Sequence, residues 1–328
     1  MTSRNSRFTK RLCRWLRFVA VSLVPFLAAA CATFEKPGQP LVPSQNATKT
    51  GSFTIFTGKP MAADSPAARS LAALEGEVEK QLGVRGPGQE PTVEIYVLKD
   101  RDAFSHFLTF YYPELPSRRA FFLAQGSKRV IYTFENERFE EDLRHEATHA
   151  LLHEGVGDLP LWLDEGLAEY FEGPAGRQGL NPEHIARLPS DIEKGWKPDL
   201  KRLEQLKNVK DMTPRDYREA WAWIHFLLDP ANEAGRATLI AYLSDIQSRK
   251  AEAEPLSARL IRGKSLEDRA LLGHIEKVRA IKSDIATEQA STRSKILLQS
   301  AANEAEPPSS EQPGFFNRFL GLFRIKPR

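Results

Sequence analysis

Residues 145–149 read His-Glu-Ala-Thr-His, an H-E-x-x-H pattern whose spacing suits a metal ion. Positions i and i+4 of a helix lie one above the other on the same face, so His145 and His149 can both point at one ion. Glu146 stands beside them, where a general base is needed if the ion activates water. Glu165, sixteen positions after His149, offers a third ligand. Two histidines and a glutamate leave the fourth position of a tetrahedral zinc open, as in catalytic rather than structural zinc sites.

Two helices joined by a short loop must position these residues. Residues 136–154 have the periodicity of a helix with one apolar stripe flanked by the histidines, and two glycines follow as stop signals. Asp158 is expected to cap a second helix that runs to Phe171. Within that helix Glu165 and Glu169 are again four residues apart, so they share a face. The two helices can therefore surround one ion.

Other histidines are weaker candidates for the site. His153 stands four residues after His149 and extends the same helical face, but Glu165 suits the third-ligand position better. His225 is typical of a core or surface histidine, and His184 of an incidental one, with a substrate contact as the open alternative. The motif itself has an alternative interpretation, a solvated helix with incidental histidines or a core histidine bonded to backbone. The glutamate-bearing helix directly downstream argues against that alternative.

With these residues, the sequence resembles gluzincin-type zinc metallopeptidases of the peptidase-MA kind. It is most similar to a group of largely uncharacterised bacterial metallopeptidases. In these an H-E-x-x-H helix precedes a segment like residues 160–170 here, Pro-Leu-Trp-Leu-Asp-Glu-Gly-Leu-Ala-Glu-Tyr. The similarity spans roughly residues 51–245. The gap from His149 to Glu165 is a few residues shorter than in the aminopeptidases of this class, so their substrate preference does not transfer.

The resemblance implies a role for each matching residue. It implies that Zn²⁺ is the cofactor and that its ligands are His145, His149 and Glu165. It implies that Glu146 acts as the general base that activates water. Glu169, one turn after the third ligand, matches a carboxylate that orients a ligating histidine in some relatives.

A further donor is needed for the oxyanion that forms during peptide hydrolysis. Residues 211–228 have the pattern of a helix with a capping segment and a proline at its start. Similar proteins carry a tyrosine at the start of such a helix, facing the site, so Tyr217 is the catalytic candidate. The alternative is an aromatic residue that covers the core. Residues 173–210, rich in Gly, Pro and charge, are expected to form a long binding loop or lid that sets substrate selectivity.

The part of the chain before the metal motif is expected to form an α/β layer. Residues 53–57 and 93–98 read as strands, residues 65–82 and 100–110 as helices, and residues 121–134 as a hairpin. The fold class is therefore α+β, with a small N-terminal α/β layer and a mixed sheet packed on a mainly helical zinc-site half, as in gluzincins. One hairpin strand could bind an extended peptide by β-augmentation; the alternative is a plain structural sheet.

Composition excludes several other classes. The chain has 328 residues and 41% hydrophobic composition, which suits one or two globular domains. Residues 1–30 hold six of the 46 basic residues and no acid, so the remainder is slightly acidic despite a net charge of +3. No basic patch with interleaved aromatics occurs in the central region, so no nucleic-acid partner is expected. The two cysteines, Cys13 and Cys31, precede the folded region and exclude a disulfide framework or cysteine-type zinc site there.

The N-terminus has the features of an export signal. Residues 1–30 combine a basic start with an apolar stretch of thirteen residues, which is short for a membrane-spanning helix of about 20 residues. Three alanines precede Cys31, so the segment resembles a bacterial lipoprotein signal with Cys31 as the lipidated residue. Residues 31–50 are expected to be a flexible tether. The alternatives, an uncleaved signal anchor or an ordinary secretory signal, also export the protein.

The remaining domains follow from composition. The basic amphipathic tail, rich in phenylalanine and free of acids, is expected to lie on an anionic membrane surface; the alternatives are docking on the protein's own core or on a partner. The expected segments after the tether are a metallopeptidase-like catalytic domain (51–250), a helical extension (251–302), a disordered linker (303–314) and this tail (315–328).

Together these features predict a zinc-dependent hydrolase, a peptidase of the bacterial cell envelope. Its partners are expected to be a peptide or protein substrate and the membrane, on the periplasmic or exterior side. The alternative is a non-catalytic envelope lipoprotein that uses a metallopeptidase-like fold to bind partners. Glu146 separates the two, because a binding protein has no need of a general base beside three ligands.

Overall fold

The computed structural model describes residues 42–85, 92–115, 117–126, 128–249, 254–263 and 269–280, all within one compact unit that starts at Pro40. The predicted signal segment 1–30, Cys31, the predicted linker 303–314 and the predicted tail 315–328 lie outside the described residues, so their assignments stay predictions. No helix in the described ranges is both long and apolar enough to cross a membrane.

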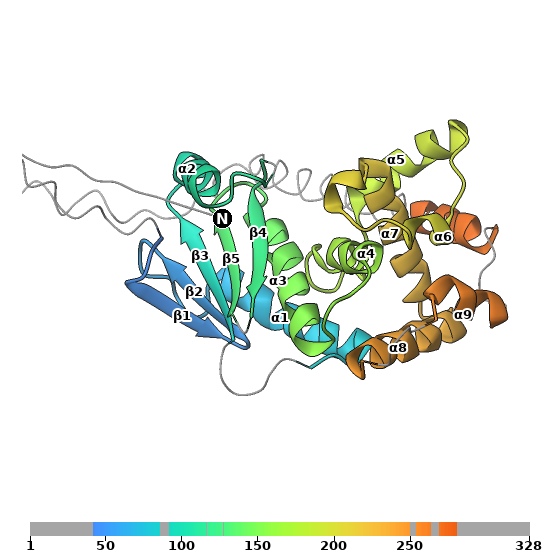
Figure 1. Ribbon diagram of the computed structural model, residues 1–328, viewed down its shortest axis with the longest axis horizontal. Coiled ribbons are helices and arrows are strands. Elements are labelled where there is room, and N and C mark those ends of the chain that lie inside the picture. Colours follow the sequence, from blue (N-terminus) through green and yellow to red (C-terminus); the bar gives the residue numbers. More distant parts are fainter. Residues whose placement is uncertain are drawn as a thin grey trace, which may run out of the picture. The chain divides into compact units, whose positions relative to one another are not determined.

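A five-stranded mixed sheet forms the N-terminal layer (Figure 1). The three central strands run parallel, and both edge strands run antiparallel to their neighbours. The predicted hairpin is confirmed, and its first strand is one edge of the sheet. In spatial order the strands are β1 (Asn46–Thr50), β2 (Phe53–Thr57), β3 (Val93–Leu98), β5 (Lys128–Phe134) and β4 (Ala120–Gln125).

The two faces of the sheet belong to different clusters because successive side chains point to opposite sides. Ile55, Ile95 and Ile131 stand at one register on three strands, are fully buried, and belong to the main core. The residues that follow them, such as Tyr96 and Tyr132, face the other way and pack on a smaller aromatic cluster. Side chains on one face of the sheet therefore pack in the main core, and side chains on the other face pack in the smaller aromatic cluster.

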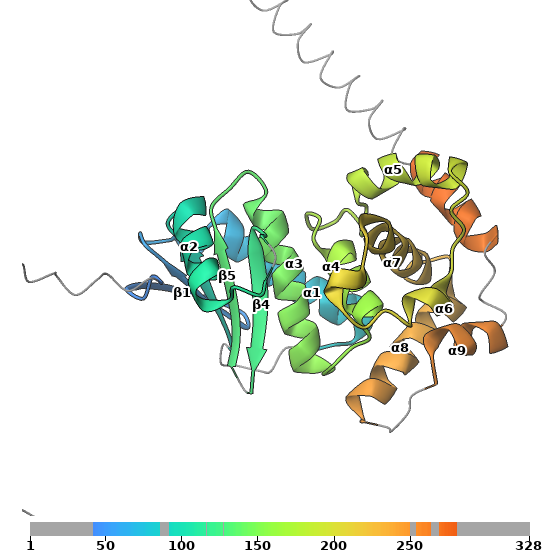
Figure 2. The same cartoon turned by 45° about the horizontal axis from the view of Figure 1, so that its top comes forward.

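Three helices cover the sheet. On the main-core face lie α1 (Pro66–Leu82) and α3 (Phe139–Gly155), and on the other face lies α2 (Arg101–Tyr111). The predicted ends are confirmed for α1, which stops at Gly83 with a φ of 71°, and for α2, which Asp100 caps through its side chain. Helix α3 lies between the sheet and the helical half in both views (Figures 1 and 2).

The second half is helical and shares the main core with the sheet, which confirms the α+β class. Residues 269–280 are also helical. Within the predicted helical extension 251–302, the described residues include helix at Leu256–Arg262 and at 269–280. The named elements are α4 (Leu161–Phe171), α5 (Pro182–Glu193), α6 (Leu200–Leu203), the 3₁₀ turn η1 (Val209–Asp211), α7 (Pro214–Leu227), α8 (Glu233–Gln247) and α9 (Leu256–Arg262).

Gly166 lets α4 and α7 approach closely. A Cβ atom at this position would stand 2.9 Å from the backbone oxygen of Ala220 and 2.9 Å from Cγ1 of Ile224. Real Cβ atoms do not approach backbone so closely, so only glycine fits without moving α7. This contact sets how near α7, which carries Tyr217, lies to the helix that carries Glu165.

The prediction of a tether up to residue 50 is wrong at its end, because residues 46–50 form β1. This strand is short and polar, as edge strands often are, so it has no hydrophobic signal. Its position is held by the ladder to β2 and by side-chain hydrogen bonds. The Thr48 hydroxyl donates to the Met61 carbonyl at 3.0 Å, and the Thr50 hydroxyl to the Ala68 carbonyl at 3.1 Å.

Two expectations about the helical half are also wrong. Much of the expected loop 173–210 is helical, because Asn181 caps α5 and the proline after it stands where helices tolerate proline. Asp158 does not cap α4: the described chain shows no side-chain capping bond there, and the helix begins after Pro160. The Asp158 side chain is instead fully exposed.

Candidate metal centre

The two histidines of α3 and Glu165 of α4 meet at one point. Nε2 of His145 lies 3.6 Å and Nε2 of His149 lies 3.8 Å from Oε2 of Glu165. The three ligand atoms lie within 4.8 Å of one another, so the group could hold a metal ion. All three side chains are at least four-fifths buried. Two imidazole nitrogens and one carboxylate oxygen form a donor set that fits zinc.

A carboxylate lies 3.0 Å from the other ring nitrogen of each histidine: Glu172, at the C-terminal cap of α4, for His145, and Asp164, in the first turn of α4, for His149. Nδ1 of His145 is hydrogen-bonded to Oε2 of Glu172 at 3.0 Å. Nδ1 of His149 lies 3.0 Å from Oδ1 of Asp164, whose other oxygen lies 3.1 Å from Nε2 of His153. A carboxylate at Nδ1 favours the tautomer that leaves Nε2 free as a ligand. Both Nε2 atoms then face Glu165.

The charge around the histidines favours a cation. Burial lowers the pKa of His145, but hydrogen bonds to Glu165 and Glu172 outweigh burial and hold that pKa well above its usual value. Burial likewise lowers the pKa of His149, but the charge of Asp164, its hydrogen bond and the charge of Glu165 together outweigh burial and raise that pKa to about 9. The negative potential that attracts a proton here also attracts a divalent metal, which competes with protons for the same nitrogens.

Glu146 and Tyr217, the two predicted catalytic residues, line the same cleft as the metal ligands. Glu146 has no hydrogen-bond or ion-pair partner among the described residues, so its carboxylate faces the cleft unengaged. Burial, and then the charge of Glu165, raise the pKa of Tyr217 to about 12. The tyrosine therefore keeps its proton at neutral pH and can donate a hydrogen bond.

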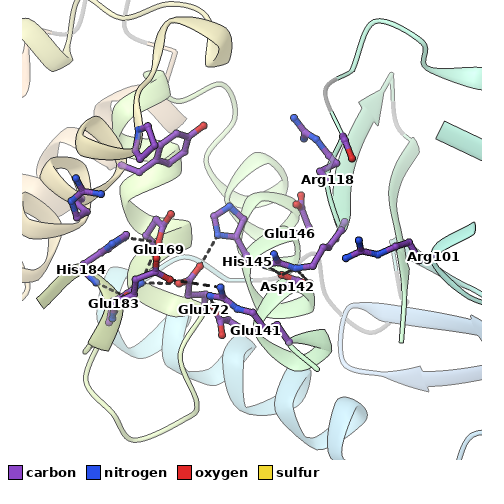
Figure 3. A pocket seen from close by; sticks show the side chains of 18 of the residues that line it. Arg101, Arg118, Glu141, Asp142, His145, Glu146, Glu169, Glu172, Glu183 and His184 are labelled. Atoms are coloured by element: carbon purple, nitrogen blue, oxygen red, sulfur yellow. Dashed lines mark hydrogen bonds and ion pairs between the residues drawn. The ribbon is translucent and has the colours of Figure 1, made fainter. Parts of the chain in front are cut away.

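Glu169 lies near His145 but makes no hydrogen bond to a ligating histidine within the described residues. Its Oε2 is hydrogen-bonded to Nε2 of His184 at 2.8 Å and accepts from Nδ2 of Asn181 at 3.2 Å. The same amide donates to Oε1 of Glu172 at 2.8 Å. The carboxylate that is hydrogen-bonded to His145 is thus Glu172 (Figure 3). The Asn181 amide joins Glu172 to Glu169, whose carboxylate also lies within 4.8 Å of a ring nitrogen of His145.

The spacing of the glutamates could have identified Glu172 from sequence, but no comparable pattern identifies Asp164 or His184. Glu165, Glu169 and Glu172 are spaced i, i+4 and i+7, so all three lie along one helical face and the third could have been recognised. Asp164 lies off that face and is identified only by its distance to His149. His184, interpreted from sequence as incidental, joins the network from α5.

An open cleft passes the metal centre. Two cavities, of about 580 and 370 Å³, share His145, Glu146, Tyr217 and Arg118. The larger continues over Glu172 (Figure 3) and Asn181, and the smaller, which that figure does not draw, over His149 and Glu165. The centre is therefore reached from two sides, as an extended ligand would require.

Comparisons with known proteins place this region in context. A protein-family model described as "Protein of unknown function (DUF1570)" matches residues 141–253, the segment that contains both metal helices. No curated protein matches the chain. Among solved structures, the chain is similar to an M1 zinc metallopeptidase from Deinococcus radiodurans, with a TM-score of 0.32 and 18% identity over 70% of this chain.

A mutant of the same enzyme gives a TM-score of 0.33 and 17% identity over 70% of this chain. The mutant bound to a Tyr-Ser-Ala substrate gives 0.29 and 20% identity over 67% of this chain. The chain spans about half the length of these structures, 50%, 50% and 46%.

Proposed function

We propose that the protein is a zinc-dependent peptidase. The observation that carries this proposal is the arrangement of the two imidazoles. Both Nε2 atoms face Glu165, each Nδ1 lies 3.0 Å from its own carboxylate oxygen, and Glu146 lies beside them in an open cleft. A structural zinc site would have four protein ligands and no cleft.

His145, His149 and Glu165 would hold the zinc. When bound, zinc supplies Lewis-acid chemistry: it polarises a carbonyl group and makes water nucleophilic near neutral pH. The Glu146 carboxylate accepts the proton of the attacking water and passes it to the leaving amide nitrogen. The Tyr217 hydroxyl donates a hydrogen bond to the oxygen on which negative charge develops.

The edge strand β4 offers a way to bind an extended peptide. It closes one side of the sheet, so its outer backbone groups are not engaged by another strand of the described sheet. Ala120 and Phe122 of this strand line the cleft beside Glu146. A substrate that adds a strand here would run past the metal centre, with main-chain hydrogen bonds giving affinity.

Export and anchoring form a separate part of the proposal, which rests on the sequence alone. Lipidation of Cys31 would place the peptidase in a bacterial cell envelope, with the tail 315–328 as a second membrane contact. Cys31→Ser should move the protein from the membrane to the soluble fraction. Unchanged membrane association would reject lipidation as the sole anchor.

The peptidase proposal is tested by zinc content and peptide cleavage in parallel. Wild type should bind one zinc and cleave members of a broad peptide library. Glu146→Gln should keep its zinc and lose about 10²–10⁴-fold in kcat, the usual contribution of a general base. Glu140→Gln, on an exposed position of the same helix, is the matched control and should behave as wild type. His149→Ala should lose stoichiometric zinc.

The outcomes separate the two candidate functions. If wild type binds zinc and cleaves no peptide in the library, the peptidase proposal fails and the non-catalytic binding protein remains. If His149→Ala retains full zinc, the ligand assignment is wrong.

A further inference from the structure

The cleft contains more positive charge than the proposed reaction uses. Most of its arginines are paired with acids. Arg119 holds Asp142 in a two-pronged contact, with Nη2 to Oδ1 at 2.6 Å and Nε to Oδ2 at 2.7 Å. Arg138 pairs with Glu141, and Arg218 pairs through Nη2 with Asp191 at 2.7 Å.

Arg118 and Arg101 are the exceptions. Neither has a hydrogen-bond or ion-pair partner in the described part of the chain. The guanidinium of Arg101 lies 6.0 Å from the ring centroid of Phe134, and its side chain is exposed. Arg118 is only partly exposed, so part of its side chain is removed from water, and no acid of the described residues pairs with it.

Arg118 stands where the reaction would take place. It lines both cavities together with Glu146 and Tyr217, and it lies two residues before the edge strand β4. Figure 3 shows Arg118 and Arg101 on the sheet side of the cleft, with Glu146 and His145 between them and the acidic group around Glu169. A peptide running along β4 would therefore pass the Arg118 guanidinium next to the general base.

We propose that Arg118, assisted by Arg101, binds a carboxylate of the substrate close to the scissile bond and selects acidic peptides. This inference rests on the proposed peptidase function. A guanidinium is planar and binds a carboxylate through two parallel hydrogen bonds, which gives direction as well as affinity. The carboxylate comes from an aspartate or glutamate side chain or from a peptide C-terminus.

The acids that line the cleft limit how much negative charge the ligand can carry. Glu146, Glu169 and Glu172 line the same cavity as Arg118, so a dianion such as phosphate would meet stronger repulsion than a single carboxylate bound to Arg118. The charge pattern thus fits a peptide with one carboxylate near the cleaved bond.

A different role for Arg118 would leave a different kinetic signature. If its guanidinium stabilised the oxyanion, its loss would slow cleavage of every peptide by the same factor, through kcat. A specificity residue instead changes the ratio between acidic and neutral substrates, mainly through KM.

The test uses the zinc-loaded full-length protein and matched fluorogenic peptides. Each pair differs by Glu against Gln at one position beside the cleaved bond, or by a C-terminal carboxylate against an amide, so the two carboxylate sources are measured separately. Wild type should prefer the carboxylate form in kcat/KM by at least about tenfold. Arg118→Gln should abolish the preference, and Arg118→Lys should keep part of it because the charge remains.

Arg85→Gln changes an exposed arginine three residues past the end of α1; it is the matched control and should keep the wild-type preference. An equal loss on acidic and neutral peptides in Arg118→Gln, or no preference in wild type, would overturn the inference.

Binding separates this inference from the proposed function. The same peptides, labelled for fluorescence anisotropy, are titrated into zinc-loaded Glu146→Gln with and without Arg118→Gln. Carboxylate-dependent binding that needs Arg118, with no cleavage by wild type, supports the anion site and rejects the peptidase. Cleavage without any carboxylate preference rejects the anion site and keeps the peptidase. Absence of both effects rejects both.

Discussion

Glu172→Gln should weaken zinc binding although Glu172 is not one of the three ligands. Its Oε2 is hydrogen-bonded to Nδ1 of His145 at 3.0 Å, and its side chain is only 11% exposed. Glutamine keeps the shape and one acceptor oxygen but removes the negative charge. The imidazole of His145 then becomes a weaker ligand and is held less firmly.

The expected loss of zinc affinity in Glu172→Gln can be calculated in two ways. A hydrogen bond to a charged group contributes about 1.5–3 kcal/mol. Loss of a carboxylate behind a ligating histidine typically lowers metal affinity by about 10–100-fold, which is about 1.4–2.8 kcal/mol. Because glutamine still accepts a hydrogen bond, Glu172→Gln should fall near the lower end, at about a tenfold increase in the Kd for zinc.

Competition with a chromophoric zinc chelator at fixed pH measures this Kd directly. Glu169→Gln is the matched control, since it lies one turn earlier on the same helix and its carboxylate is bonded to His184 rather than to His145. It should change the Kd by a smaller factor. A Kd for Glu172→Gln within twofold of wild type, or an equal effect of Glu169→Gln, would refute the reasoning.

Two further predictions concern stability. Gly166→Ala should lower the free energy of unfolding by about 1–3 kcal/mol in urea, because its Cβ would collide with the backbone of α7, whereas Gly76→Ala, with open space around it, should not. Burial, with the charge of His274 next, lowers the pKa of His225 to about 4, so the unfolded chain takes up its proton first. Between pH 7 and pH 5 the titration of His225 should therefore lower the free energy of unfolding by about 1–2 kcal/mol, and this contribution is measured as the change with pH of the difference between wild type and His225→Gln. If the difference in the free energy of unfolding between wild type and His225→Gln did not change with pH, the titration of His225 would not be the cause.

The sequence was sufficient for the elements whose signals are local. The helical spacing of His145 and His149 predicts a shared face, and the downstream helix brings Glu165 to them. The helix caps at Asp100 and Gly83 and the hairpin near residue 126 were likewise predictable, because each depends on a few neighbouring residues.

Features that depend on distant contacts were not predictable. The polar strand β1 exists because β2 and the segment around Met61 accept its hydrogen bonds, which no pattern within residues 46–50 reveals. The partnership of Asp164 with His149, and that of Glu169 with His184, follows from the angle at which separate helices meet. Arg118 became a candidate only in the structure, where three other arginines of the cleft pair with acids and Arg118 does not within the described residues.

The metal centre depends on the direction in which each carboxylate of α4 and of its C-terminal cap points around the helix axis. One residue inserted between Gly166 and Glu169 would leave Glu165 in place but turn everything after it by about 100°. Glu172 would then point away from His145. The connection 156–160 between α3 and α4 contributes none of the described ligands or orienting carboxylates. Changes of chain length should therefore be tolerated between the two helices and excluded within α4.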